Sequence, residues 1–314
     1  MDIINAHVHM IEVEAMLSRY PGTALSSDIS VFGEIEASLP LLSPETLICQ
    51  MDEAGIAMSI LYAVEAPIVY ASNEYVHRLC AEYADRLLGF ASVDPRRGDA
   101  ADVLDRAVQD LGLKGLKLHP PLQGFRPDDE VVYPVYEKAV ELDIPVVFHV
   151  GTTPFGSLCR LSQASPLLVD EVAVAFPTLR IMLTHLGTLW HNEAFMVVEK
   201  NPNVFIDTAA YLYEIPQLMT PDTVRRVGPD RFVFGTDYPM PYVGRVHRMK
   251  DFVETVAGLD LPQPMRDAIL GQNVHAFLNG RERDGSAVDL GQILKKAVGG
   301  PSAAPAEGPD RDAP

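Results

Sequence analysis

The sequence is poor in cysteine, in positive charge and in long apolar runs, and each scarcity excludes a class of protein. Its 314 residues include three cysteines, Cys49, Cys80 and Cys159, which are far apart and odd in number. No two of them have the Cys-x-x-Cys spacing of a redox or zinc motif. A disulfide framework is therefore not expected, and the pattern favours a reducing, cytoplasmic environment.

Positive charge is scarce, because 25 lysines and arginines face 43 aspartates and glutamates, for a net charge of −18. Nucleic acids and anionic membrane surfaces both require a basic footprint, so neither is an expected partner. A small anionic substrate is still compatible, since a local site can be positive within an acidic protein. No apolar run is long enough to span a bilayer, and the N-terminus does not resemble a signal peptide.

What the sequence does contain is a series of short apolar runs rich in Val, Ile and Phe. These runs lack polar alternation, which is typical of strands buried on both faces. Eight such runs occur, at 2–6, 56–62, 88–93, 114–118, 144–149, 180–185, 203–207 and 231–236. Stretches with helical spacing lie between them, and Ser43 followed by Pro44 marks a capped helix start. The alternation predicts an α/β fold, a (β/α)8 TIM barrel of parallel strands with helices outside.

The expected domain organisation is a single barrel over residues 1–298. The segment 10–43 is too long for a simple strand–helix loop and is predicted to be a lid or binding loop. A helical pattern at 264–278 follows the last strand. Residues 299–314 hold no large aliphatic or aromatic side chain, so we expect a disordered tail.

Residues with metal-binding or acid–base chemistry end several of these runs. His7 and His9 lie two positions apart behind the first run, so on a strand both imidazoles point to the same face. His149, His185 and Asp237 each end a separate run. In a TIM barrel the C-terminal ends of the strands form the active site. These five residues are therefore expected to converge on one site.

Several stretches resemble the amidohydrolase superfamily, in particular its amidohydrolase-related (amidohydrolase 2) branch. That branch includes aminocarboxymuconate semialdehyde decarboxylase and related metal-dependent hydrolases. The matching stretches are Asn5-Ala6-His7-Val8-His9, Gly115-Leu116-Lys117-Leu118-His119-Pro120, Val147-Phe148-His149-Val150-Gly151, Thr184-His185-Leu186-Gly187, Asn203-Val204-Phe205-Ile206-Asp207-Thr208 and Phe234-Gly235-Thr236-Asp237-Tyr238-Pro239. The resemblance implies that His7, His9, His149 and Asp237 are metal ligands, and that His185 is the catalytic histidine.

Three imidazole nitrogens and one carboxylate oxygen suit a single divalent ion, with Zn²⁺ favoured and Mn²⁺ also accommodated. Such an ion lowers the pKa of a bound water from about 16 toward roughly 7. Asp237 would hold the ion and accept the proton of that water. His185 would polarise a substrate carbonyl or act as an acid or base.

A second set of residues has two interpretations each. Lys117 either binds substrate, lies beneath the site, or bridges two metals as a lysine on the fourth strand does in some superfamily members. His119 either lines the pocket or fixes the turn before Pro120. The remaining candidates for substrate binding, with a solvated loop or plain packing as the alternative for each, are Arg160, Trp190 and Tyr238.

The leading functional hypothesis is a hydrolase that uses metal-bound hydroxide on an ester, lactone, amide or other C=O or C–N centre of a small molecule. The alternative is non-oxidative decarboxylation of an aromatic or unsaturated carboxylic acid, which the same five residues can serve. Many aromatic decarboxylases resembling this branch carry Glu where this chain has His7, although aminocarboxymuconate semialdehyde decarboxylase keeps the His-x-His pair. A barrel that only binds metal or ligand is a third hypothesis. The resemblance also makes a homodimer a candidate state.

Overall fold

Eight strands of the computed structural model coincide with the eight apolar runs. The structure describes residues 2–19, 39–66, 69–153, 155–209, 211–239 and 246–280. The strands are β1 (Ile3–His9), β2 (Ile56–Tyr62), β5 (Leu87–Phe90), β6 (Leu116–Leu118), β7 (Val146–Phe148), β8 (Ile181–Leu183), β9 (Val204–Asp207) and β10 (Phe232–Val233). Because each run is almost entirely buried, its lack of polar alternation reflects burial on both faces.

The strands are all parallel and form two sheets, in the orders β1-β2-β5 and β10-β9-β8-β7-β6. Backbone hydrogen bonds join the sheets at both edges. Beyond β5, the Ala91 nitrogen donates to the Gly115 carbonyl and the Lys117 nitrogen donates to the Ala91 carbonyl, both at 2.7 Å. Beyond β10, the His9 nitrogen donates to the Tyr238 carbonyl at 2.8 Å. The predicted (β/α)8 TIM barrel is therefore correct.

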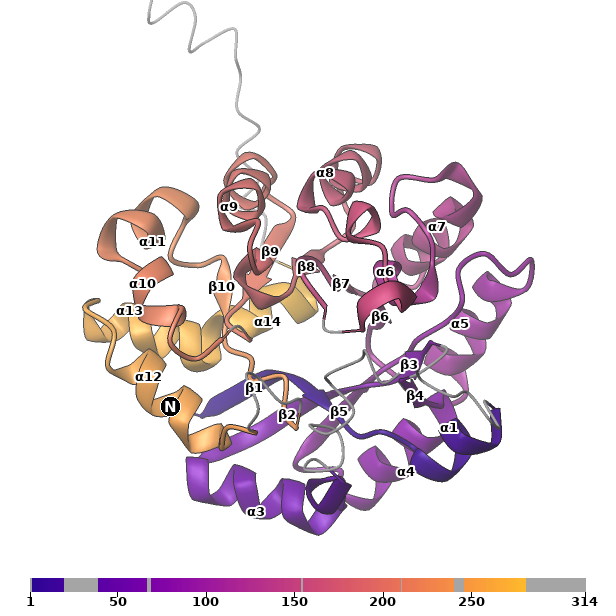
Figure 1. The fold of residues 1–314 in the computed structure, drawn as a ribbon, viewed down its shortest axis with the longest axis horizontal. Coiled ribbons are helices and arrows are strands. Elements are labelled where there is room, and N and C mark those ends of the chain that lie inside the picture. Colours follow the sequence, from indigo (N-terminus) through magenta and orange to yellow (C-terminus); the bar gives the residue numbers. More distant parts are fainter. Residues whose placement is uncertain are drawn as a thin grey trace, which may run out of the picture. The chain divides into compact units, whose positions relative to one another are not determined.

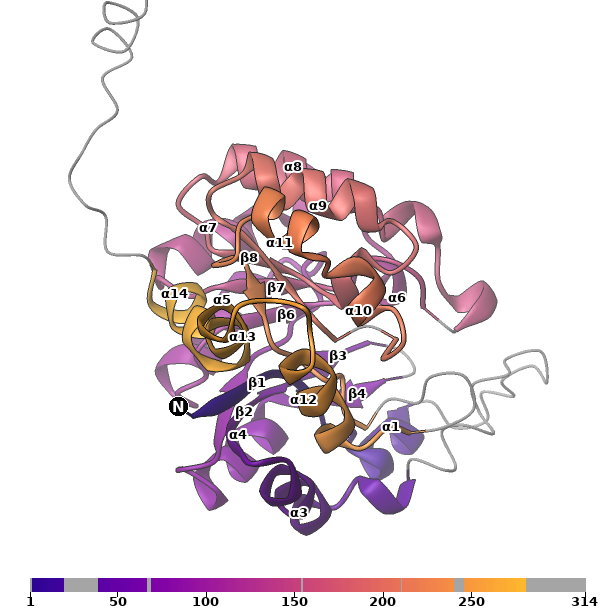
Figure 2. The same ribbon diagram turned by 90° about the vertical axis from the view of Figure 1, so that its left-hand side faces the viewer.

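Helices lie outside the ring of strands (Figures 1 and 2). They are α1 (Val13–Arg19), α3 (Pro44–Ala54), α4 (Asn73–Glu82), α5 (Ala100–Gln109), α6 (Pro120–Gln123), α7 (Tyr133–Glu141), α8 (Pro166–Ala175), α9 (His191–Lys200), α10 (Ile215–Leu218), α11 (Pro221–Val227), α12 (Met249–Ala257), α13 (Gln263–Asp267) and α14 (Asn273–Asn279). Ser43 caps α3 by accepting a hydrogen bond from the Thr46 nitrogen, as its position predicted. Within the described residues, every helix is too short or too polar to cross a bilayer.

The helical pattern at 264–278 is interrupted, because a π-helical turn (Ala268–Gln272) separates α13 from α14. The insertion 10–43 contains α1 and a short 3-10 turn at Leu39–Leu41. Its middle part, residues 20–38, lies outside the described residues, as do the predicted tail 299–314 and the predicted boundary at 298. A small antiparallel hairpin of β3 (Val64–Glu65) and β4 (Tyr70–Ala71) follows β2.

The barrel interior is apolar and is closed at one end by α14. Phe277 and Val274 of α14 belong to the same buried cluster as the inward side chains of the strands, among them Ile4, Val147 and Met182. Outward side chains such as Leu116 and Leu118 pack with the helices in a separate cluster. The interior is therefore filled, and most of the polar side chains that the structure describes there gather where the strands end.

Candidate metal centre

The two histidines of β1 point into the barrel because the strand is irregular. Its neighbours Ile4 and Ala6 belong to the interior cluster, whereas Val8 belongs to the outer one. Simple alternation would have placed Val8 inside. A register shift between Asn5 and Val8 changes the phase, and an irregularity of this kind redirects side chains. His7 and His9 therefore turn inward, where they are almost fully buried.

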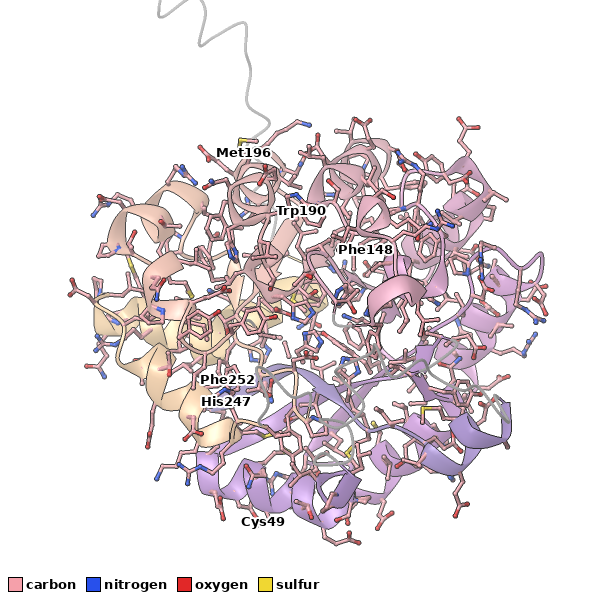
Figure 3. The ribbon with its side chains drawn as sticks, in the orientation of Figure 1. Cys49, Phe148, Trp190, Met196, His247 and Phe252 are labelled. Carbon is pink, nitrogen blue, oxygen red and sulfur yellow. The ribbon has the colours of Figure 1, made fainter. Side chains whose placement is uncertain are left out.

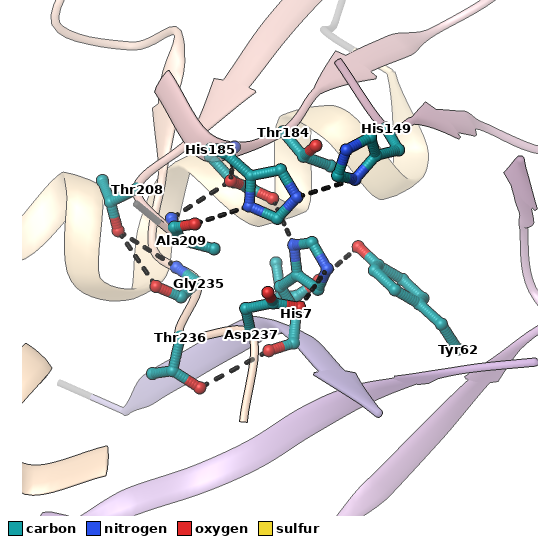
Figure 4. Close-up of polar contacts among 12 residues, drawn as sticks. His7, Tyr62, His149, Thr184, His185, Thr208, Ala209, Gly235, Thr236 and Asp237 are labelled. Atoms are coloured by element: carbon teal, nitrogen blue, oxygen red, sulfur yellow. Dashed lines mark hydrogen bonds and ion pairs between the residues drawn. The ribbon is translucent and has the colours of Figure 1, made fainter. Parts of the chain in front are cut away.

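Asn5 ties the His7 segment to the end of β10. Its side-chain nitrogen donates to the Thr236 hydroxyl at 2.8 Å. Its side-chain oxygen accepts from the backbone nitrogens of Thr236 at 3.1 Å and His7 at 3.2 Å. The Asp237 nitrogen also donates to the His7 carbonyl at 2.9 Å. His7 and Asp237, which are far apart in sequence, thus have a fixed relative position (Figure 4).

Three ligand-type atoms meet at this point. The Nε2 atoms of His7 and His9 lie 3.1 Å apart, and the Asp237 Oδ1 lies 3.1 Å from the first and 3.3 Å from the second. Ligands about 2.1 Å from a zinc-type ion are about 3.4 Å apart in a tetrahedron and about 3.0 Å apart at right angles. The spacing of this buried group therefore fits one face of the coordination shell of a divalent ion.

The electrostatics of the triangle also favour a cation. Burial and Lys117 oppose protonation of His7, but the carboxylates of Asp207 and Asp237 outweigh them and raise its pKa. Burial lowers the pKa of His9 to about 4. Burial would raise the pKa of Asp237, but the adjacent imidazoles hold it well below its usual value. His9 and Asp237 therefore have the protonation states that a metal requires, a neutral imidazole and an ionised carboxylate. At His7 the two carboxylates favour a positive charge, and a bound cation would replace the proton there.

His149 and His185 extend the cluster on its other side. The His185 Nε2 lies 3.0 Å from the His149 Nδ1, and the His185 Nδ1 donates to the Ala209 carbonyl at 2.6 Å (Figure 4). Burial lowers the pKa of both rings. The His149 Nε2 is buried and has no hydrogen-bonding partner among the described residues, which suits a ligand atom. The ring centroids of His7 and His185 lie 5.1 Å apart.

One residue at the centre of this cluster, Asp207, was not among the sequence candidates. It ends β9 and is fully buried. Its Oδ2 lies 2.7 Å from the His7 Nδ1, and its Oδ1 accepts from the His185 nitrogen at 2.7 Å. Its position at the end of the seventh apolar run was the available signal.

Lys117 lies inside the barrel beneath the histidines. It is 1% exposed, and its ammonium is 5.0 Å from the centre of the Tyr62 ring. That ring also contacts His7, at 4.9 Å between centroids, so Tyr62 is a further site residue that the sequence did not reveal. Burial lowers the pKa of Lys117 to about 8.

His119 stacks on His149 with 3.8 Å between ring centroids, and so it contacts a proposed ligand.

The other predicted substrate-binding residues lie outside this cluster. Arg160 is exposed in the loop after β7. Trp190 is half-buried immediately before α9 (Figure 3). Tyr238 is buried, and its hydroxyl donates to the Leu41 carbonyl at 3.3 Å, which ties the end of the 10–43 insertion to the strand ends.

Comparison with known proteins gives a consistent family match. Residues 36–279 match the family described as Amidohydrolase. A gamma-resorcylate decarboxylase of Rhizobium radiobacter is 26% identical over 62% of this chain and 76% of its own length. A 2-keto-4-carboxy-3-hexenedioate hydratase of a Sphingobium species is 28% identical over 48% of this chain and 53% of its own length.

Solved structures give the same fold. A 5-carboxyvanillate decarboxylase of Novosphingobium aromaticivorans, crystallised with bound manganese and a nitrobenzoic acid ligand, superposes with a TM-score of 0.69 and 19% identity. The match covers 88% of this chain and 97% of that one. An uncharacterised TIM-barrel protein of Bordetella bronchiseptica also has a TM-score of 0.69, with 21% identity over 90% of this chain and all of that one.

Proposed function

Because the chain belongs to the amidohydrolase family, we propose that it is a metal-dependent carboxy-lyase acting on an aromatic or unsaturated carboxylic acid. The comparisons support decarboxylation better than the hydrolysis expected first. Hydrolysis is supported only by the family membership. Two similar proteins are decarboxylases of aromatic acids, and one of them was crystallised with manganese. The His-x-His pair formed by His7 and His9 resembles the pair in aminocarboxymuconate semialdehyde decarboxylase, an enzyme that decarboxylates an unsaturated acid.

The observation that carries this proposal is the buried triangle of His7, His9 and Asp237. The His149 ring is connected to it through His185, which contacts both His149 and His7. We assign the three residues of the triangle and His149 as ligands of one divalent ion, with Mn²⁺ or Zn²⁺ as the candidates. Held by these residues, such an ion would supply a Lewis acid beside an anionic substrate. Lys117 adds a buried positive charge, which favours an anionic substrate despite the acidity of the chain.

Decarboxylation requires one proton at the substrate carbon. The bond to the carboxylate breaks, its electron pair stays on that carbon, and the carbon takes the proton as CO2 leaves. We assign the transfer of this proton to Asp237, whose ionised carboxylate first takes the proton from solvent water and then gives it to the carbon. His185 is the second candidate, although its Nε2 is engaged with His149 and its Nδ1 with Ala209.

The test is turnover of the manganese- or zinc-loaded protein on hydroxylated aromatic acids, unsaturated polycarboxylic acids, lactones and esters. Each reaction is run in D2O, and separately in ¹⁸O-labelled water. Decarboxylation releases CO2 and places deuterium on the product carbon. Product that gains ¹⁸O without CO2 release would instead establish hydrolysis, or hydration as in the Sphingobium relative. The Asp237→Asn variant is the control, and it should lose turnover on every substrate.

A further inference from the structure

We infer that Asp207 is a positioning residue that sets the ring tautomers of His7, His185 and His149, and thereby makes Nε2 the metal-binding nitrogen of both His7 and His149. The inference rests on the ligand assignment proposed above. It assigns to one carboxylate the ring tautomers of three histidines, each at the end of a different strand.

The first link is direct. The Asp207 Oδ2 lies 2.7 Å from the His7 Nδ1, and both side chains are fully buried. An ionised carboxylate only accepts hydrogen bonds, so the Nδ1 of a neutral His7 must carry the hydrogen. The lone pair is then on Nε2, the atom that faces His9 and Asp237. A carboxylate behind a ligating imidazole is a common means of fixing its tautomer and orientation.

The second link runs through the backbone of two strand ends. The Asp207 Oδ1 accepts from the backbone nitrogens of His185 at 2.7 Å and Ala209 at 3.1 Å. These bonds hold His185 in a left-handed backbone conformation with φ of 63°. They also orient the Ala209 carbonyl, which lies 2.6 Å from the His185 Nδ1. A carbonyl only accepts, so Nδ1 carries the hydrogen of a neutral His185.

The third link follows from the second. The Nε2 of this His185 tautomer has a lone pair, and it lies 3.0 Å from the His149 Nδ1. One hydrogen must lie between two nitrogens at that distance, so the His149 Nδ1 supplies it. The lone pair of His149 is then on its Nε2, the buried atom that has no partner among the described residues.

His77 is the internal control for this chain of contacts. It lies on α4, outside the barrel, and its Nδ1 donates to the Leu111 carbonyl at 2.8 Å. His9 is instead coupled to His7, because their Nε2 atoms lie 3.1 Å apart. Asp207 should therefore determine the tautomers of His7, His149 and His185 and leave His77 unaffected.

The first experiment records the ¹H–¹⁵N spectra of the histidine rings in the metal-free wild-type protein labelled at histidine. We expect hydrogen on Nδ1 in His7, His149 and His185. A ring of His7 or His149 that carries hydrogen on Nε2 and none on Nδ1 would overturn the inference. This experiment requires no variant and no metal, so it remains valid if Asp207 variants fail to fold or if the protein proves not to be a decarboxylase.

The second experiment compares Asp207→Asn with Asp170→Asn by calorimetric titration with Mn²⁺ alone. Asp170 is a matched carboxylate on α8 that bonds Lys200 at 2.6 Å, away from the site. An asparagine at 207 can donate through its amide and so stabilise the wrong His7 tautomer. We expect Asp207→Asn to weaken Mn²⁺ binding by about 10- to 100-fold, and to shift the His7 ring signals but not those of His77. Asp170→Asn should change neither.

Unchanged affinity in Asp207→Asn would refute the role of Asp207 while leaving the proposed function intact. Wild-type protein that binds no Mn²⁺ or Zn²⁺ would refute the ligand assignment, whereas the tautomer spectra would still test Asp207.

Discussion

At the scale of single residues, two proposed functional side chains have unusual backbones. His185 has φ of 63° and Asp237 has φ of 56°, a region that residues other than glycine seldom occupy. Such conformations cost about 1–3 kcal/mol each and persist only where surrounding contacts impose them. Here the contacts are the Asp207 carboxylate behind His185 and the His7 carbonyl behind Asp237. Backbone strain is thus found at two of the residues whose side chains form the proposed site.

The division of roles between His149 and His185 predicts different effects of removing each ring. His149→Ala deletes a proposed ligand and should lower the metal content of purified protein well below one ion per chain. His185→Ala should still reach one ion per chain at saturating metal, while losing most turnover. Metal analysis and steady-state kinetics on both variants provide the test. Loss of metal from His185→Ala, with retention in His149→Ala, would reverse the assignment.

Gly235 is predicted to be essential for the spacing between β10 and β1. A Cβ at this position would lie 2.9 Å from the His7 Cβ, too close without movement of the strand. Gly235→Ala should therefore lower the free energy of unfolding by about 1–3 kcal/mol and weaken metal binding. Gly98→Ala is the control, because nothing lies within 4 Å of its added Cβ. Urea denaturation with metal titration tests both, and equal behaviour of the two variants would contradict the prediction.

At the scale of elements, the phase of each strand decides which side chains enter the site. Val147 points into the barrel, so two residues later His149 does also. Three segments depart from the period-two rule. β1 changes phase at its irregularity, and the chain adopts a left-handed conformation at His185 after β8 and at Asp237 after β10. Those departures bring the other proposed functional side chains to the same place as His149.

The closing helix gives a prediction at this scale. The side-chain nitrogen of Asn273, the first residue of α14, donates to the carbonyls of Pro229 and Phe232, each at 2.8 Å. Asn273→Ala would leave both carbonyls without this donor, and should lower the free energy of unfolding by about 2 kcal/mol. Asn279→Ala, at the exposed end of the same helix, should change it by less than about 0.5 kcal/mol. Thermal or urea denaturation measures both, and a neutral Asn273→Ala would show that the helix is held by packing alone.

At the scale of the whole molecule, the site joins the two ends of the barrel. The ligand triangle unites the first and last strands, at the edge where the ring closes. A metal ion there would crosslink segments more than two hundred residues apart. Its binding energy should therefore stabilise the entire barrel, because the unfolded chain has no preformed site.

This predicts a metal-dependent melting temperature. An ion at one hundred times its dissociation constant adds about 2.7 kcal/mol to the free energy of unfolding. For a domain of this size each kcal/mol raises the melting temperature by about 2–4 °C, so a rise of about 5–10 °C is expected. Differential scanning calorimetry with Mn²⁺, and again after a chelator, measures it. His7→Ala should show almost no rise, and a wild-type protein that melts at the same temperature with and without metal would contradict the assignment.

The order of buried strands and the identity of the residues that end them were readable from the sequence. Both depend on local periodicity, and His149 follows the period of its own strand. Asp207 was missed although it ends a predicted strand, because an aspartate at a strand end has the same local signature whether it caps a loop or binds a histidine. Its partner, His7, is 200 positions away.

The sequence by itself therefore determined the fold class, the eight strands and most of the polar residues at their ends, since burial and side-chain alternation are properties of short segments. Only the tertiary structure decided which atoms face one another: the triangle of His7, His9 and Asp237, the contacts of Asp207, and the position of Lys117 beneath them. The physical reason is that these contacts arise from ring closure and from local departures from strand regularity in β1, at His185 and at Asp237. These features have no signature in the neighbouring residues of the sequence.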